Sequence, residues 1–244
     1  MTSSDVWGPD AAARYDESSA SMFTPEVLDP TVDLLAGLAG DGRALELAIG
    51  TGRVGIPLAE RGVPVYGIEL SEPMVAQLHR RRPELPVVVG DMAQARVEGT
   101  FSLVYLVYNT IGNLRTQEEQ VACFANAAQH LEPGGRFVVE VGMPALRRFP
   151  PGQRAVPFHV GEQHVGLDLY DTATQQAESH HYSRQPDGSY RHEVLHYRYV
   201  WPAELDLMAR LAGMTLERRT ADWQGTPFTG DSESHVSIWR TPPG

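Results

Sequence analysis

The sequence predicts a doubly wound α/β domain that carries an inserted antiparallel β segment. Between residues 43 and 141, strand-like and helix-like segments alternate. The strand-like segments are apolar without alternation, which is typical of parallel strands buried on both faces of a sheet. After residue 143 prolines interrupt the chain, and long polar strands follow over residues 164–200. Because a turn at residues 186–188 separates these strands, they predict an antiparallel hairpin or small sheet.

Composition and charge restrict the partners of this chain. Of its 244 residues, 42% are hydrophobic and 21% are charged, which is ordinary for a globular protein. The net charge of −11 argues against nucleic acid and against anionic membranes, since both attract basic surfaces. It is compatible with a cationic or neutral small molecule. A homodimer is one arrangement open to such a chain.

Two further features of the sequence bear on location. The N-terminus has no signal-peptide pattern, and the most apolar run, residues 101–108, is too short to cross a bilayer. We therefore expect a cytoplasmic protein with no membrane partner. Cys123 is the single cysteine, so no internal disulfide can form, and its apolar helical surroundings predict a core position.

Local signals predict the order of elements. Residues 1–12 are polar and small and predict a mobile tail. Ser71 is a good helix N-cap, and Pro83 stops the helix that follows it. The predicted strands are 43–49, 64–70, 87–89 (as a buried strand), 101–108, 136–141, 214–223 and 235–240, and the predicted helices are 24–39, 54–61, 71–82, 116–131 and one from 202, with a turn at 132–135.

The same signals divide the chain into four parts. Residues 1–40 form an N-terminal cap segment, and 41–142 form the ligand-binding α/β domain. Residues 143–200 form an inserted antiparallel β lid. Residues 201–244 supply a helix and strands that complete the first sheet.

A glycine-rich loop joins the first predicted strand to the next helix. It reads ELAIGTGRVG over residues 46–55 and contains the G-x-G-x-x-G spacing of dinucleotide sites. Small residues at the carboxyl end of a first strand allow a ligand to approach the backbone closely. Taken alone, the glycine spacing is also compatible with a tight strand-to-helix turn that binds no ligand.

Three acidic residues favour one kind of ligand. Glu46 lies inside an apolar strand, where pyrophosphate would repel its carboxylate and an ammonium group would stabilise it. Glu69 ends the next strand and can accept hydrogen bonds from ribose hydroxyls, which many cofactors carry. Asp91, in the run Gly90–Asp91–Met92, can accept a hydrogen bond from an adenine amino group, with Met92 packing on the ring.

Five runs of residues together resemble a known family. ELAIGTGRVGIPLAERG, VYGIELSEPM, VVVGDM, FSLVYLVYNTIGNL and HLEPGGRFVVEV resemble, in this order, the motifs of class I S-adenosylmethionine-dependent methyltransferases. The resemblance covers roughly residues 43–142. The inserted segment and the run A-x-R-Y-D at residues 12–16 resemble the branch of glycine N-methyltransferases and amino-sugar N,N-dimethyltransferases.

The resemblance implies a fold, a cofactor and a reaction. The fold is a Rossmann-like sheet of seven strands with the last strand antiparallel. The cofactor is S-adenosylmethionine, S-adenosylhomocysteine is the product, and the methyl group goes to a nitrogen or oxygen of a small molecule in specialised metabolism. The residues implied at the cofactor are Arg14, Glu46, Ala48, Gly50, Gly52, Arg53, Glu69, Leu70, Met74, Gly90, Asp91, Met92, Val107 and Tyr108.

Two candidate catalytic residues come from opposite ends of the domain. Asn109 follows the fourth strand of the domain, at the edge where open α/β sheets bind ligands, and can orient the acceptor. A role as a simple loop cap is the alternative. In the branch named above, a tyrosine of the N-terminal segment covers the cofactor and reaches the substrate. This makes Tyr15 a candidate, with a packing anchor as the alternative.

Histidines are concentrated in the inserted segment. Six of the nine are there, at positions 159, 164, 180, 181, 192 and 196. Neighbouring strand residues face opposite sides, so His180 and His181 cannot share one site, and we predict no metal. An imidazole titrates near neutral pH, and His181 is our candidate for a general base, with an exposed hairpin histidine as the alternative.

Two other functions compete with methyl transfer. The glycine spacing taken alone fits an NAD(P)-dependent oxidoreductase, against which Glu46 and the Gly90–Asp91 pair count. The second competitor is a relative that binds the cofactor without catalysis, and no residue in the sequence excludes it.

Overall fold

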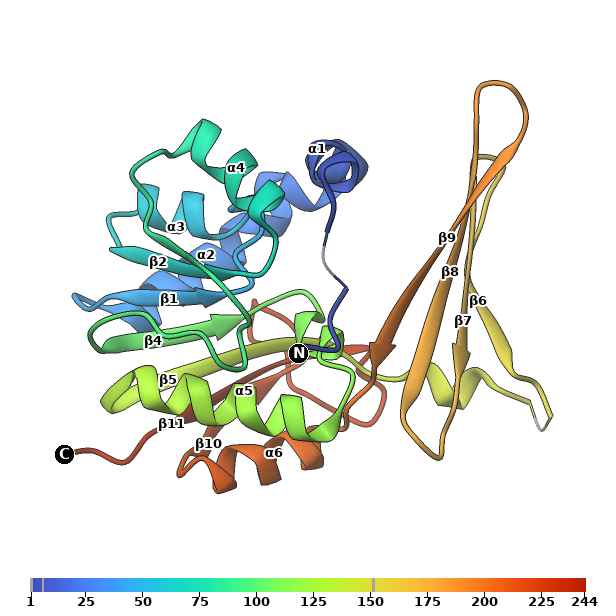
Figure 1. Ribbon diagram of the computed structural model, residues 1–244. Helices are drawn as coiled ribbons and strands as arrows, with labels where there is room; N and C mark the ends of the chain where they lie inside the picture. The colour runs from blue at the N-terminus through green and yellow to red at the C-terminus, as the bar shows by residue number, and fades with distance from the viewer. Residues whose placement is uncertain (1, 6, 151) are drawn as a thin grey trace.

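The computed structural model describes residues 2–5, 7–150 and 152–244 and folds into two sheets (Figure 1). The larger sheet has seven strands in the order β10-β11-β5-β4-β1-β2-β3. The smaller sheet has four strands in the order β6-β7-β8-β9 and stands beside the larger one. Helices cover both faces of the larger sheet, which confirms the predicted doubly wound α/β class.

Five strands of the larger sheet are parallel. Each helix returns the chain to the edge where the next strand begins, so all five carboxyl ends meet at one edge. These elements are β1 (Ala44–Leu47), α3 (Gly55–Glu60), β2 (Val65–Glu69), α4 (Glu72–Arg81), β3 (Val87–Val89), β4 (Phe101–Leu106), η2 (Thr110–Asn113), α5 (Gln117–His130) and β5 (Leu131–Gly142). Ser71 caps α4 as predicted, because its Oγ accepts a hydrogen bond from the Met74 amide.

The C-terminal segment completes the larger sheet. It comprises α6 (Pro202–Leu211), β10 (Thr215–Thr220) and β11 (Ser234–Arg240). The last strand, β11, lies between β5 and β10 and is antiparallel to both. This confirms the seven-stranded arrangement that the family resemblance implies.

Two apolar cores lie on the two faces of this sheet. Beneath α5 and α6, Phe124 packs edge-on against Phe137 and Trp239. The opposite face is covered by α2 (Pro25–Ala39), α3 and α4, with Leu35 and Leu58 fully buried. Cys123 is buried in the first core, as the sequence predicts.

The N-terminal segment differs from its prediction. The expected mobile tail over residues 1–12 is wrong for the residues described, because α1 begins within it and runs from Pro9 to Ser18. Proline suits the first turn of a helix, where its missing N–H has no partner to lose. The Ser3 amide also donates to Glu119 (2.7 Å), and the Trp7 carbonyl accepts a hydrogen bond from Ser71 (2.6 Å). A short helix, η1 (Ala20–Phe23), leads on to α2.

Two strands also differ from their predictions. β3 is not buried, because it forms the edge of the sheet and leaves Val88 and Val89 36% and 49% exposed. β5 begins at Leu131 and not after the predicted turn. Its pairing with β4 jumps from Leu131 to Arg136, so the turn residues 132–135 bulge out of the strand.

The inserted sheet consists of β6 (Ala155–Val160), β7 (His164–Tyr170), β8 (Gln176–Arg184) and β9 (Tyr190–Arg198), which follow η3 (Ala145–Arg148). All neighbours are antiparallel and pair in sequence order. The sequence analysis did not predict β6, because Pro157 lies inside it. A proline is tolerated there because β6 is an edge strand.

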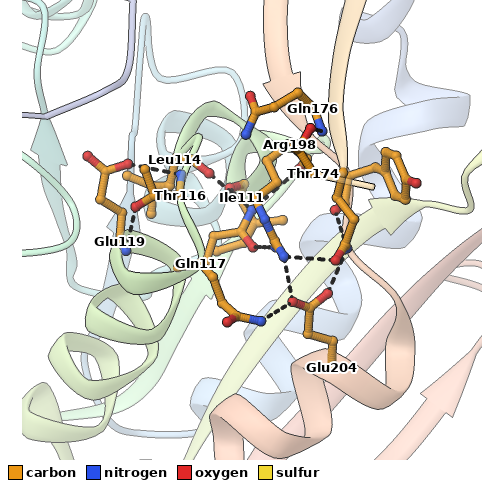
Figure 2. Close-up of polar contacts among 12 residues, drawn as sticks. Ile111, Leu114, Thr116, Gln117, Glu119, Thr174, Gln176, Arg198 and Glu204 are labelled. Carbon is orange, nitrogen blue, oxygen red and sulfur yellow. Dashed lines mark hydrogen bonds and ion pairs between the residues drawn. The ribbon is translucent and has the colours of Figure 1, made fainter. Parts of the chain in front are cut away.

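A buried ion pair ties the inserted sheet to the helices of the main domain (Figure 2). Arg198, at the end of β9, donates to Glu204 of α6 (2.7 Å), and their side chains are only 5% and 14% exposed. The Arg198 guanidinium also donates to Gln120 of α5 (2.5 Å) and to Gln175 (3.0 Å). Gln117 and Gln175 both donate to the Glu204 carboxylate, so both charges are satisfied by hydrogen bonds.

We predict that this ion pair is needed for stability. Arg198→Ala leaves the Glu204 carboxylate buried without its cation, which should lower the free energy of unfolding by about 3–5 kcal/mol. Urea denaturation measures the change. Arg191→Ala, which removes an exposed partner of Glu193 on the same strand, is the control and should change stability by less than about 0.5 kcal/mol. Equal effects of the two substitutions would contradict the prediction.

Candidate functional site

The glycine loop at the end of β1 has a left-handed backbone at three positions. Ala48, Gly50 and Gly52 have φ values of 54°, 59° and 83°. A Cβ on Gly52 would lie 2.8 Å from Cγ1 of Ile56, closer than side chains tolerate. Glycine is therefore required at position 52 for both its backbone angle and its surroundings. Ala48 holds the same kind of backbone with a side chain, which stores some strain at this position.

Glu46 is buried beside this loop. It is 3% exposed and lies directly opposite Tyr105 of β4, whose hydroxyl donates to Oε2 of Glu46 (2.9 Å). Burial raises the pKa of Glu46 to about 8, although the Tyr105 hydroxyl, the Arg53 charge and the Gly55 backbone oppose the rise. A carboxyl group in this state gains from a cation placed next to it.

Glu69, at the end of β2, holds the loop in place. Its Oε2 accepts a hydrogen bond from the Gly50 amide (2.9 Å) and its Oε1 accepts one from the Ser71 amide (2.8 Å). Burial raises the pKa of Glu69, and these amide hydrogen bonds oppose the rise. Each carboxylate oxygen keeps a second lone pair for a hydroxyl donor.

Asp91 has one satisfied and one unsatisfied oxygen. Its Oδ1 accepts a hydrogen bond from the Ala93 amide (2.8 Å). Its Oδ2 is buried and has no hydrogen-bond partner among the described residues. Such an atom is costly unless a donor reaches it, and an adenine amino group is a donor of this kind. Of its neighbours in the run Gly90–Asp91–Met92, Met92 is buried in the core.

The other predicted cofactor residues differ in how exposed their side chains are. Met74 and Val107 are buried, and Leu70 is half-buried between Glu69 and the N-cap of α4. Arg14 is exposed on α1, and its guanidinium forms no ion pair within the part of the chain that the structure describes. Arg53 is the cation beside the loop, and its guanidinium lies 5.3 Å from the centre of the Tyr108 ring.

The N-terminal helix α1 docks on the glycine loop. Asp16 accepts a hydrogen bond from the Thr51 hydroxyl (2.6 Å) and pairs with Arg81 (3.1 Å). This brings Tyr15 close enough to Arg53, Tyr108 and Glu46 for their charges to act on it. Burial raises the pKa of Tyr15, and the Arg53 charge opposes this. The sequence analysis missed Asp16, although it belongs to the same A-x-R-Y-D run as Tyr15.

Tyr108 and Asn109 form a strained turn after β4. Their φ values are 57° and 60°, which is uncommon for residues with side chains. Glu140 of β5 supports the turn, because its Oε2 accepts from the Tyr108 amide (2.9 Å) and its Oε1 from the Trp223 indole (2.8 Å). The sequence analysis missed Glu140, since nothing in an apolar strand predicts which backbone amide a carboxylate will meet.

The Asn109 side chain is bound to the main chain of a neighbouring strand. Its Oδ1 accepts a hydrogen bond from the Gly142 amide (2.5 Å) at the end of β5. The side chain therefore links the ends of β4 and β5 and does not cap η2. Tyr108, in contrast, is 50% exposed at the edge where the parallel strands end.

His181 lies on the inserted sheet, among other polar side chains. Its Nδ1 is 3.1 Å from Nε2 of His164, and its Nε2 is 3.1 Å from the Ser179 hydroxyl. Burial and the His164 charge lower the pKa of His181. His180 instead contacts His192 and Glu178, as expected for the opposite face. No group of three or more possible metal ligands occurs within the described ranges.

Comparisons with known proteins agree with this geometry. A family model described as a methyltransferase domain matches residues 44–135, which span β1 to the beginning of β5. The CcbJ methyltransferase of Streptomyces caelestis has 35% identity and a TM-score of 0.85, with 99% of this chain and 98% of that chain covered. The cypemycin N-terminal methyltransferase of a Streptomyces species is 29% identical, with 92% of this chain and 96% of the relative covered.

A third relative is more similar over a shorter stretch. The dTDP-3-amino-3,4,6-trideoxy-alpha-D-glucopyranose N,N-dimethyltransferase of Streptomyces venezuelae is 38% identical over 96 residues, 39% of this chain and 40% of the relative. The seven-stranded fold and the carboxylate-lined glycine loop define a nucleoside-binding α/β enzyme. The chain belongs to the S-adenosylmethionine-dependent methyltransferases, as the sequence resemblance implies. The nicotinamide-dependent alternative is therefore set aside.

We predict that Gly52 is required for more than its backbone angle. Gly52→Ala places a side chain on a left-handed backbone and also brings its Cβ too close to Ile56. The two costs together should lower the free energy of unfolding by roughly 2–4 kcal/mol. Gly62→Ala is a matched control, because Gly62 has φ +90 and open space around it. The control should cost only about 1–2 kcal/mol. Urea denaturation of both variants checks this, and an equal loss would contradict the prediction.

Proposed function

We propose that this methyltransferase transfers a methyl group to the nitrogen of a small-molecule amine in specialised metabolism. The observation that carries the nitrogen acceptor is the likeness, over nearly its whole length, to a relative named as an N-terminal methyltransferase. The relative from S. venezuelae is named as an N,N-dimethyltransferase of an amino sugar. Oxygen is the second acceptor that we consider.

The residues at the ends of β1, β2 and β3 are proposed to hold the cofactor. S-adenosylmethionine supplies an activated methyl group when it is bound. Glu46 would hold the ammonium of the methionine part, Glu69 the ribose hydroxyls and Asp91 the adenine amino group. The Oδ2 of Asp91, which has no partner among the described residues, supports this assignment, as does the raised pKa of Glu46.

The remaining members of the predicted cofactor set surround these three carboxylates. The loop would bring its backbone close to the cofactor, and Tyr108 would lie beside the methyl group. Arg14 is proposed to approach the cofactor carboxylate from α1. The full proposed set is Arg14, Glu46, Ala48, Gly50, Gly52, Arg53, Glu69, Leu70, Met74, Gly90, Asp91, Met92, Val107 and Tyr108.

Alignment and proton removal are the tasks left to the protein, because the methyl donor is already activated. Tyr15 on α1 would cover the reacting groups and exclude water. Asn109 would fix the end of β4 that faces the acceptor. His181 is proposed as the general base, since its lowered pKa keeps the imidazole neutral and able to accept a proton.

Several parts of this proposal rest on the sequence alone. They are the division of the chain at residues 40, 142 and 200, the absence of nucleic acid among the partners, a homodimer and a cytoplasmic location. Within the ranges that the structure describes, no helix has both the length and the apolar character needed to span a membrane.

Titration calorimetry tests the cofactor site. S-adenosylmethionine and S-adenosylhomocysteine should bind with micromolar affinity, and NAD should not bind. Glu69→Ala should weaken binding at least about tenfold, since it removes charged hydrogen bonds to two hydroxyls. Glu84→Ala is the control, because Glu84 is exposed and forms its ion pair with Arg82, away from the loop. Binding of NAD alone would overturn the proposal.

We further predict that S-adenosylhomocysteine binding at pH 7 releases a proton from Glu46. In the free protein the pKa of Glu46 is about 8, so the group is mostly protonated at pH 7. A bound ammonium lowers this pKa and ionises the carboxyl group, so affinity should fall as the pH falls below 8. Calorimetry in buffers with different ionisation enthalpies counts the protons.

Glu46→Gln is the control for this count. The glutamine cannot ionise, so ligand binding to this variant should release up to one proton fewer than binding to the wild type. Protons that come from the ligand's own amine are the same for both proteins and cancel in the comparison. Identical proton release in both proteins would show that Glu46 does not face the ammonium.

A further inference from the structure

A cavity of about 480 Å³ lies between the two sheets. Its lining consists of residues 143–145, Asp168, Tyr170 and residues 231–233. The first group directly follows β5 and the last directly precedes β11, so the cavity is at the edge where the parallel strands end. The Met143 amide donates to the Glu233 carbonyl (2.8 Å), and the neighbouring Gly142 amide donates to Asn109. Met143, which lines the cavity, therefore directly follows the residue that is hydrogen-bonded to the strained turn after β4.

The inserted sheet presents a carboxylate to this cavity. Asp168 of β7 is half-buried and forms no ion pair with lysine or arginine in the described part of the chain. The Tyr170 hydroxyl donates to its Oδ2 (3.3 Å). Burial raises the pKa of Asp168, and hydrogen bonds from Ser179, Tyr170 and Tyr197 together with the His181 charge oppose the rise. Among the side chains that the structure describes, the carboxylate therefore has hydrogen-bond donors around it but no arginine paired with it.

Aromatic residues lie on the same face of the inserted sheet as this carboxylate. Tyr170 pairs with Ala177, which pairs with Tyr197, so the three residues form one row across β7, β8 and β9 on the face that carries Asp168. The Tyr170 ring centre is 6.3 Å from that of Tyr197 and 5.4 Å from that of Phe149. Asp168 and Tyr170 both line the cavity. A carboxylate beside aromatic rings can bind an alkylammonium group, by ion pairing and by cation–π attraction to a ring that the cation contacts.

We propose that Asp168, Tyr170 and Tyr197 bind the acceptor through its aliphatic amine in the ammonium form. This inference rests on the function proposed above and names the recognition site for its substrate class. Aliphatic amines are protonated at neutral pH, and an N-methylated product keeps the positive charge. The same site therefore serves acceptor and product, and the general base removes the proton before transfer.

Choline and its uncharged isostere 3,3-dimethylbutan-1-ol test the site without any turnover, since neither offers an amine to methylate. Both are titrated into protein that is saturated with S-adenosylhomocysteine. Choline should bind at least about tenfold more tightly than the isostere, because only choline is attracted by the carboxylate and the rings. Asp168→Asn should remove this difference, and Tyr170→Leu should weaken choline binding about fivefold or more.

Glu178→Gln is the matched control. Glu178 lies on the same sheet but on the opposite face, where it contacts His180 and His196, and its loss should leave choline binding unchanged. Unchanged binding of S-adenosylhomocysteine shows that each variant is folded.

The outcomes separate the two proposals. Failure of the wild type to bind S-adenosylhomocysteine would overturn the proposed function. If S-adenosylhomocysteine binds normally, three results would overturn the amine site and leave the proposed function intact. These are no binding of choline, equal binding of choline and its isostere, and a Glu178→Gln variant that weakens choline binding as much as Asp168→Asn does.

Discussion

The burial of one carboxyl group governs the geometry at the carboxyl end of β1. Glu46 sits at the end of β1, between the neighbouring strands β2 and β4, where water cannot reach it. Three neighbours compensate for that position, whereas the charge of Glu69 adds to its cost. Tyr105 donates from the adjacent strand, Arg53 brings a positive charge, and Gly55 allows α3 to begin against the carboxylate, since a Cβ there would lie 2.7 Å from Oε2 of Glu46. The beginning of α3 is therefore fitted to this buried carboxyl group.

The two sheets present different chemical groups. The parallel sheet offers carboxylates at the ends of β1 and β2 and after β3, which suit a nucleoside with an ammonium group. The inserted sheet offers a different chemistry, with tyrosines, histidines and Asp168. The ion pair of Arg198 and Glu204 joins them where β9 meets α6. Because both charges are buried, this junction tolerates little displacement, and the two surfaces keep a defined relation to each other.

Much of the fold could be predicted because its signals are local. Apolar runs, Ser71 as a cap and the glycine loop each act within a few residues, and the ends of β1, β2 and β3 carry the acidic residues that the sequence analysis selected. Contacts between distant segments could not be predicted in this way. Asp16 with Thr51, Glu140 with the Tyr108 amide, and Arg198 with Gln120 depend on packing that no spacing encodes. The exposure of Val88 and Val89 was also missed, since an edge strand and a central strand can share one apolar pattern.

The inserted sheet has little interior of its own. Each of its four strands contains a single buried residue, namely Val156, Gly166, Ala177 and Arg198, whereas five of the six residues of β4 are buried. Its hydrogen-bond ladder is consequently protected by few apolar contacts, and local opening should cost far less free energy there than in the parallel sheet. Amide hydrogens of β6 to β9 should exchange with solvent long before those of β4. The sheet that we propose to meet the acceptor is thus the part of the molecule that unfolds most easily, and an acceptor bound between the sheets would stabilise it.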